Sequence, residues 1–154
     1  MAYTKLQGRR AISVVPQDGV IVPSPSDLVA EGTADVLTAN SLEDTTAAFA
    51  GKVIPGATVY NTTNNTVATV TSVSGTVLGL SSNIFPLGTE NYKVYNTNNS
   101  EGPVLFVGTG GTLDIVTVGG DRVKLLNIAD GSYVPVLVSE VLTATTASDI
   151  VALW

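Results

Sequence analysis

The sequence predicts an all-β protein, an antiparallel β-sandwich or barrel-like meander with a small β-module inserted and little or no helix. Short apolar runs with period-two alternation recur along the chain, as in half-buried strands. Gly, Asn and Asp cluster between the runs, where hairpins need residues that tolerate positive φ. Only Ser41–Asp44 resembles a helix start, and the poor helix formers Thr45 and Thr46 follow it, so at most one or two helical turns are expected.

Residues 1–27 are predicted to form an N-terminal extended arm and edge strands. Two short apolar runs, Ala11–Val15 and Gly19–Val22, are interrupted by three prolines. Because proline has no N–H to give to a strand ladder, these runs suit edge strands or an extended arm and not central strands.

Residues 28–98 are predicted to form the inserted small β-module. Three alternating segments at 57–60, 66–73 and 76–80 are separated by short turns, and 92–95 supplies a fourth strand. Whether this module folds independently stays open. Alternation in the longest segment places one set of side chains on a common face: Val67, Thr69, Thr71 and Val73.

Residues 99–154 are predicted to form a C-terminal β-meander that packs with the N-terminal strands. The polar stretch 96–103 is the best candidate linker, and Gly-rich or Asp-Gly turns separate the runs that follow. The segment 133–142 is the longest strand candidate, and its apolar content predicts burial on both faces. The apolar runs are 104–107, 113–118, 123–128, 133–142 and 150–154.

Composition favours subunit association. Charged residues make up 13% of the chain and hydrophobic residues 44%, so little charge is available to keep an isolated monomer soluble. The alternative is a monomer coated with Thr, Ser and Asn.

Charge is distributed unevenly. The net charge is −6, yet Lys5, Arg9 and Arg10 give the first ten residues +3, which leaves −9 for the rest. Such a basic arm suits an acidic neighbouring protein. Nucleic acid is the weaker alternative and is not predicted as a partner, because three charges are far fewer than a DNA-binding face carries.

The residue types needed for common catalysis are missing. Without His or Cys the chain lacks the commonest general base, the thiolate nucleophile and the usual zinc ligands. Glu43 and Asp44 are adjacent, so in a strand they point to opposite faces and do not form an acid/base pair. We therefore predict no enzyme activity, no catalytic residues and no cofactor.

Two loop motifs also have simpler interpretations. Gly108–Gly111 lacks the Lys-Ser/Thr of a phosphate loop and precedes a strand, so a hairpin turn is favoured. Asp114, Asp121 and Asp130 lack the Asp-x-Asp-x-Asp spacing of a calcium loop, so no metal site is predicted.

The N-terminus lacks the apolar stretch of a signal peptide, and no segment approaches the roughly 20 apolar residues that span a bilayer. We therefore expect no membrane partner and a protein that matures in a cytoplasm.

Interface residues are predicted from the basic arm and from the aromatic and aliphatic residues of the last strands. An aromatic residue ending a strand pattern, Trp154, suggests an anchored terminus. The interface candidates are Lys5, Arg9, Arg10, Tyr133, Val136, Val138, Ile150, Leu153 and Trp154.

Several segments resemble small virion structural proteins of tailed, marine or cyanobacterial phages, and are similar to head spike-base proteins of phage-like gene transfer agents. The ending of those relatives reads Thr-Thr-Ala-x-Asp-Ile-x-Ala-Leu before an aromatic residue, and 145–154 matches it throughout. The middle block, at 44–49 and 59–63, looks like a β-module that recurs in marine phage structural proteins. The other matching segments are 8–16, 103–111, 118–121 and 131–136.

The resemblance implies a non-enzymatic virion protein, assembled in the host cytoplasm, that decorates or cements the capsid or forms a head spike base. It implies a homo-oligomer, with a trimer or pentamer plausible, in contact with the major capsid protein or neighbouring virion proteins. The family offers no active site to transfer.

Two alternatives stay open: a tail or baseplate component, and a receptor- or carbohydrate-binding β-module. The second requires Tyr60 or Tyr95 to face solvent beside the Asn/Thr turns.

Overall fold

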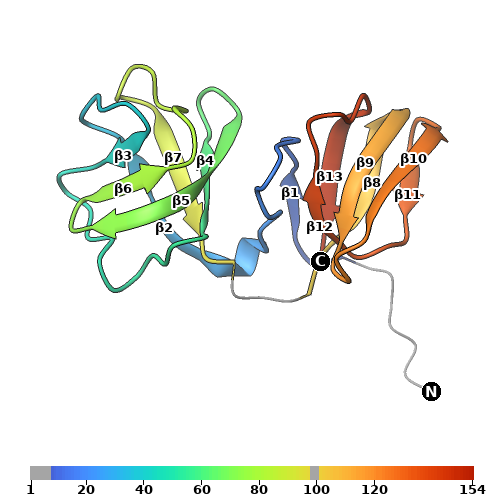
Figure 1. The fold of residues 1–154 in the computed structure, drawn as a ribbon, viewed down its shortest axis with the longest axis horizontal. Helices are drawn as coiled ribbons and strands as arrows, with labels where there is room; N and C mark the ends of the chain where they lie inside the picture. The colour runs from blue at the N-terminus through green and yellow to red at the C-terminus, as the bar shows by residue number, and fades with distance from the viewer. Residues whose placement is uncertain (1–7, 98–100) are drawn as a thin grey trace.

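The computed structural model describes residues 8–97 and 101–154 and confirms the all-β fold class (Figure 1). All strand pairs in it are antiparallel. Among these residues the only helical segment is one 3-10 turn, η1 (Pro25–Asp27). The strands belong to two units. We call residues 28–97 the six-stranded unit, and residues 8–27 with 101–154 the flanking unit.

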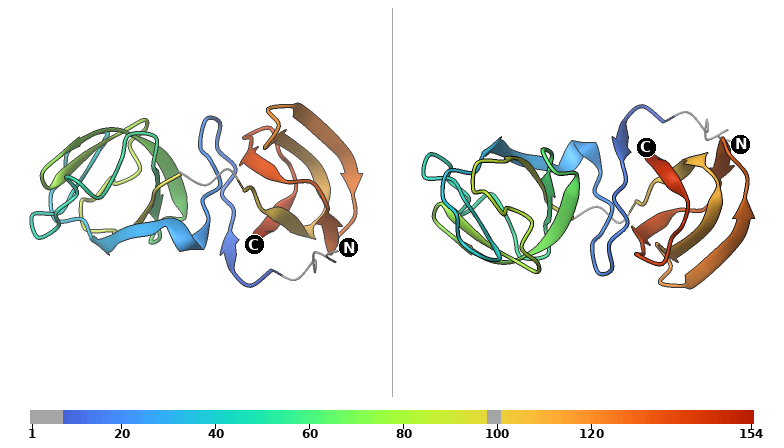
Figure 2. Two further views of the ribbon diagram at one scale, coloured as in Figure 1. Left: turned by 90° about the horizontal axis from the view of Figure 1, so that it is seen from below. Right: turned by 90° about the horizontal axis from the view of Figure 1, so that it is seen from above.

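The six-stranded unit is one sheet that curls around its own core, in the order β2-β7-β4-β5-β6-β3 (Figure 2). Residues predicted to tolerate positive φ occupy its turns: Asn65 has φ 54° and Gly75 has φ 55°. The strands are β2 (Leu28–Thr33), β3 (Ser41–Glu43), β4 (Thr58–Asn61), β5 (Thr66–Ser74), β6 (Val77–Leu80) and β7 (Asn91–Tyr95).

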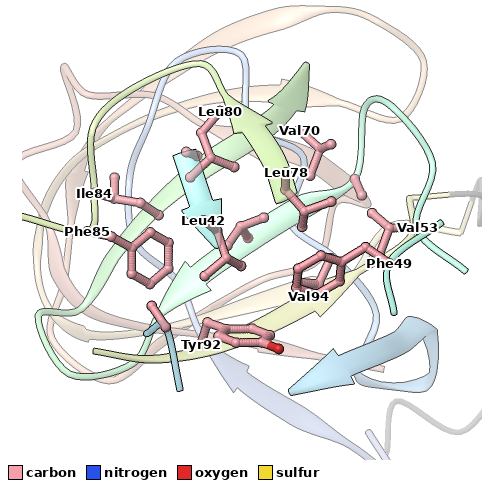
Figure 3. Packing of buried hydrophobic residues seen from close by; sticks show 14 residues of the cluster. Leu42, Phe49, Val53, Val70, Leu78, Leu80, Ile84, Phe85, Tyr92 and Val94 are labelled. Atoms are coloured by element: carbon pink, nitrogen blue, oxygen red, sulfur yellow. The ribbon is translucent and has the colours of Figure 1, made fainter. Parts of the chain in front are cut away.

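Aromatic and aliphatic side chains fill the interior of this sheet (Figure 3). Phe49 packs edge-on against Tyr92, with 5.9 Å between ring centroids. Leu42, Leu78 and Phe85 are fully buried beside them. Removing this apolar area from water supplies the main stabilisation of the unit.

A bulge in β5 corrects the predicted face of that strand. Val67 and Val70 lie on opposite faces as alternation predicts, but pairing shifts between Val70 and Ser72. Thr71 is the extra residue, so Val73 packs on the core that Val70 occupies.

The predicted helix start at Ser41–Asp44 is instead a strand followed by a turn. β3 pairs with β6, and the buried Asp44 carboxylate accepts hydrogen bonds from the backbone N–H groups of Thr46 and Ala47. An aspartate that bonds the backbone just after it favours a turn over a continued helix.

The flanking unit is a sandwich of two sheets, ordered β1-β13-β8-β11 and β10-β9-β12. Side chains from both sheets form its core. The strands are β1 (Ala11–Ser13), β8 (Val104–Thr109), β9 (Gly111–Thr117), β10 (Arg122–Ile128), β11 (Ser132–Val134), β12 (Val138–Val141) and β13 (Ser148–Leu153).

The predicted hairpin turn at Gly108–Gly111 is a crossing between the two sheets, because β8 and β9 do not pair with each other. The turn at 129–131 crosses between the sheets in the same way. Of the turns predicted here, only the one at 119–121 closes a hairpin, where Thr117 N–H donates to Asp121 O at 2.9 Å.

The predicted long strand 133–142 is two short strands, β11 and β12, in different sheets. Pro135 lies at the break, since it cannot donate to a ladder. Tyr133 and Leu137 are exposed, which corrects the expectation that both faces of this segment are buried.

The segment Val14–Val22 belongs to the flanking unit and lies on the side of it that faces the six-stranded unit (Figure 1). On one side Gln17 N–H donates to Val141 O at 2.9 Å. On the other side Thr58 Oγ1 donates to Ile21 O at 2.8 Å. A small apolar cluster fills the junction. It consists of Val20, Tyr60, Val67 and Tyr95, and Ile12 and Val15 pack against it.

Candidate assembly surface

The sheet β1-β13-β8-β11 has one buried and one open face. Strand register aligns Tyr133, Phe106 and Val151 in one row across three strands. Because side chains alternate along a strand, these residues point away from the core that holds their neighbours. Core-facing residues of this sheet are Leu105, Val107, Val134, Ile150 and Ala152.

We call the open side the outer face. Tyr133 is 68% exposed, and the Phe106 ring lies against it with 5.2 Å between centroids. Within the described residues, no member of the outer face belongs to a core cluster. The outer face comprises Ala11, Val104, Phe106, Tyr133, Val151 and Leu153.

Opposite charges lie at the two ends of this sheet. Trp154 N–H donates to Arg10 O at 3.0 Å, and the Arg9 and Arg10 N–H groups donate to Trp154 O, which fixes both exposed arginines at one end. At the other end the Asp149 carboxylate accepts a hydrogen bond from Thr109 Oγ1 at 2.8 Å, and Asp130, in the turn before β11, accepts from Gly110 N–H at 2.6 Å. The sheet therefore has a basic end and an acidic end.

The predicted interface residues fall into several environments. Tyr133 and Leu153 lie on the outer face. Val138 and Ile150 are buried in the chain's own core, so their side chains are not available to another chain. Val136 is exposed in the connection between β11 and β12.

Trp154 and the arginines contact their own chain. The half-buried indole packs against the flanking core, and its Nε1–H donates to Glu101 O at 3.3 Å. The Arg10 guanidinium donates to Pro25 O at 3.2 Å. Lys5 lies outside the described residues.

The predicted interface candidates do not include Val104, Phe106 and Val151. Each sits in an apolar run in which periodicity alone does not say which neighbour faces the core. In the last strand Ile150 and Ala152 face the core, but the neighbouring Val151 and Leu153 are equally apolar, so the sequence carries no signal that marks the outer residues.

Asp114 illustrates how this protein uses its buried carboxylates. The Arg122 guanidinium donates to it through Nε at 3.1 Å and Nη2 at 2.9 Å, and Lys124 Nζ lies 3.9 Å away. This bidentate pairing, with the charge of Lys124, lowers the pKa of Asp114. In the part of the chain that the structure describes, no three acidic residues gather as metal ligands.

A cavity of about 290 Å³ lies at the junction of the two units. Its walls are mainly apolar and include Asp27 and Glu101, and burial raises the pKa of Asp27. Residues 98–100, between the wall residues Thr97 and Glu101, are outside the described part of the chain.

The carbohydrate-binding alternative requires Tyr60 or Tyr95 to face solvent, but both side chains are buried. Tyr60 and Tyr95 retain 7% and 5% exposure, and their rings pack edge-on with 5.7 Å between centroids. Burial raises the pKa of both phenols. Neither ring offers a stacking surface beside the Asn/Thr turns.

No known protein family, curated protein or solved structure matches this chain. Over the described residues, no helix has the length and apolar character needed to cross a membrane.

Proposed function

We propose that this chain is a non-enzymatic structural protein of a tailed-phage virion that assembles as a homo-oligomer and decorates or cements the capsid, or forms a head spike base. The structural observation that supports the proposal is the outer face, an open apolar sheet surface with charged residues at both ends. The sequence resemblance supplies the virion context.

An open apolar face suits lasting protein contact. Contiguous exposed apolar surface rimmed by polar groups is typical of sites that bind other proteins. Aromatic side chains such as Tyr133 and Phe106 are enriched in the centres of such interfaces, where they supply much of the binding energy.

The buried carboxylates support a structural role. Asp44 and Glu90 accept backbone N–H groups of adjacent turns, and Asp114 is bound by Arg122. Each is committed to holding the chain's own structure. We expect hydrolase assays on nucleic acid, peptide and glycan substrates to show no turnover above that of a blank; turnover lost on replacing one acidic residue would contradict this.

A tail or baseplate position is the main alternative, because the outer face suits either location. A receptor- or carbohydrate-binding module is less favoured, because Tyr60 and Tyr95 are buried.

Cryo-electron microscopy of the virions expected to contain the chain tests the proposal. Density for the two β units on the head surface is the expected result. Density in the tail would select the alternative, and absence of the chain from purified virions would overturn the proposal.

A second experiment tests the outer face: purified protein is added to phage heads that lack it, and its attachment is measured. Tyr133→Ser should weaken attachment or the assembly that precedes it. Leu126→Ser serves as the matched control, because Leu126 is 63% exposed on β10 and lies off the outer face. Equal loss in both variants would count against the outer face.

A further inference from the structure

We infer that copies of this chain join edge to edge, with β10 of one copy adding to β2 of the next copy as an antiparallel strand. The inference rests on the self-assembly in the proposed function and names the surfaces that join the copies. These surfaces are two sheet edges that lie apart from the outer face.

Two of the described strands have a side that bonds to no other segment. Every other described strand longer than three residues has a partner on both sides. Even β12, at the border of its sheet, accepts N–H groups from Gln17 and Val22. The free sides of β2 and β10 have no such bonds within the described residues, and both strands lie along the outside of the molecule (Figure 2). A free side presents N–H and C=O groups to which a further strand can add.

On β10, Arg122 and Lys124 direct their backbone N–H and C=O groups away from β9. Thr117 N–H donates to Asp121 O at 2.9 Å where the hairpin closes, and bonded pairs alternate along an antiparallel ladder. The ladder is regular as far as the bulge at 125–128. The free edge of β10 therefore has two outward residues and ends at a bulge.

On β2, the outward backbone groups belong to Glu31 and Thr33. Ala34 N–H donates to Glu90 O at 2.9 Å, and bonded pairs alternate from there along the ladder with β7. This ladder is regular back to the bulge at 28–30. The free edge of β2 thus matches that of β10 in length, in the number of outward residues and in ending at a bulge.

Charge selects one antiparallel register between the two edges. Placing Lys124 opposite Glu31 aligns the outward residues and brings the two bulges to the same end. Both side chains are accessible, since Lys124 is 53% exposed and Glu31 is 61% exposed. Their ladder partners in their own chains are Asp114 and Lys93, so the contact continues a row of alternating charges from one copy to the next. Opposite charges in facing positions stabilise a strand pair.

The inward side chains of the two edges are complementary in size. The same register places Leu125 opposite Ala30 and Val123 opposite Gly32. Leu125 packs on the core of the flanking unit and Ala30 on the core of the six-stranded unit, so the inner faces of the two sheets meet. Val123 is 37% exposed in one chain and would be covered in the contact.

Pairing of two β10 edges is disfavoured. Within the regular part of the strand, every symmetric register sets Arg122 or Lys124 opposite a like charge, which is destabilising. The contact is therefore heterologous, and copies joined in this way form a closed ring or a continuing chain.

Exchanging the charges tests the contact. The natural chain should sediment at micromolar concentration as an assembly of several copies. Lys124→Glu and Glu31→Lys should each raise the dissociation constant at least about tenfold, because like charges then face each other. An equimolar mixture of the two variants should assemble again, because each contact between unlike variants joins opposite charges. Lys52→Glu is the matched control, since Lys52 is exposed in a turn away from both edges, and it should leave the assembly unchanged.

Hydrogen exchange of the natural chain tests the edges without any substitution, and it decides the matter if a variant fails to fold. The outward N–H groups of Glu31, Thr33, Arg122 and Lys124 should exchange rapidly in dilute protein and slowly in the assembly. The exposed loop 37–39 is the control and should exchange at the same rate in both.

A monomer at micromolar concentration would overturn the inference. So would a mixture of the two folded variants that stays dissociated, or an assembly in which exchange at the two edges is not slowed. Each of these results would leave the virion location standing, because that location is decided by density on the particle. Absence of the chain from virions would remove the virion function without touching the edge contact.

Discussion

Asp44 and Glu90 show how single buried carboxylates hold turns in this protein. Each is nearly inaccessible to solvent, and burial alone would raise its pKa. Hydrogen bonds from neighbouring groups outweigh that effect and lower both pKa values, because a charged acceptor is stabilised by N–H and O–H donors. Tyr92 Oη donates to Asp44 at 2.8 Å, which links the turn after β3 to β7.

We expect the Asp114→Asn variant to lose less folding stability than the natural chain as the pH falls. The pKa of Asp114 is lowered in the folded state, so its stabilising contribution is present above the unfolded value of about 3.9 and is lost as pH falls through the folded pKa. Urea midpoints of the natural chain should therefore fall more steeply below about pH 4 than those of the variant.

Asp121→Asn is the control for this experiment, because Asp121 is exposed in the adjacent turn. Parallel pH profiles for the natural chain and Asp114→Asn would show that the pair with Arg122 does not contribute to acid stability.

Trp154→Ala should lower the free energy of unfolding by about 1–3 kcal/mol, less than for a fully buried indole, because the side chain is half-buried. Trp154→Phe keeps most of the packing and loses the bond to Glu101, so it should cost about 1 kcal/mol. Denaturant unfolding measures both. Unchanged stability in Trp154→Ala would show that this terminus is not anchored by its side chain.

At the scale of elements, the crossing from β8 to β9 depends on one close backbone approach. A Cβ at Gly110 would lie 2.2 Å from Ile128 O, and Gly110 N–H bonds the Asp130 carboxylate. The crossing joins the two sheets of the sandwich, so a shift of its backbone would displace both sheets.

Gly110→Ala should destabilise the protein by about 2–4 kcal/mol. The new Cβ would collide with backbone atoms, which cannot move aside as a flexible side chain can. Gly119→Ala is the matched control: its Cβ would have no neighbour closer than 3.6 Å, and the change should stay within about 0.5 kcal/mol. Thermal unfolding compares the two. Equal effects would mean that the sandwich tolerates a displaced crossing.

Local pattern predicted most strands but not how they pair. The runs near 66–73 and 91–95 became β5 and β7 because alternation and turn residues act over a few positions. The bulge at Thr71 and the crossing at Gly110 depend on contacts with distant segments, which a local pattern does not contain. The outer face was only partly predicted, since it exists only once β8 lies beside β13.

At the scale of the whole molecule, the segment Val14–Val22 fixes one unit against the other. Val20 is 7% exposed in the junction cluster, whereas neighbouring Ile21 is 38% exposed. The junction also carries the bond from Thr69 Oγ1 to Gly19 O at 3.0 Å. Two small cores are thereby joined through one shared segment.

Val20→Asp should release this segment from the six-stranded unit at a cost of at least about 2 kcal/mol, because it would bury a charged carboxylate in the apolar cluster of Tyr60, Val67 and Tyr95. Small-angle scattering should show a wider range of separations between the two units, while both cores keep their protection from hydrogen exchange. Ile21→Asp is the control and should leave the scattering unchanged. Unchanged scattering in Val20→Asp would show that the junction does not depend on the cluster.

The pairing of β2 with β7 also bears on how a nascent chain reaches this structure. β1 and β13 are separated in sequence by the whole six-stranded unit, and joining such distant strands through a disordered loop costs much chain entropy. Leu28 and Tyr95 are register partners, so once the six-stranded unit has folded its two ends lie side by side. Its early folding during synthesis therefore removes 28–97 from the loop that must close when β1 meets β13, which lowers the entropic cost of that closure.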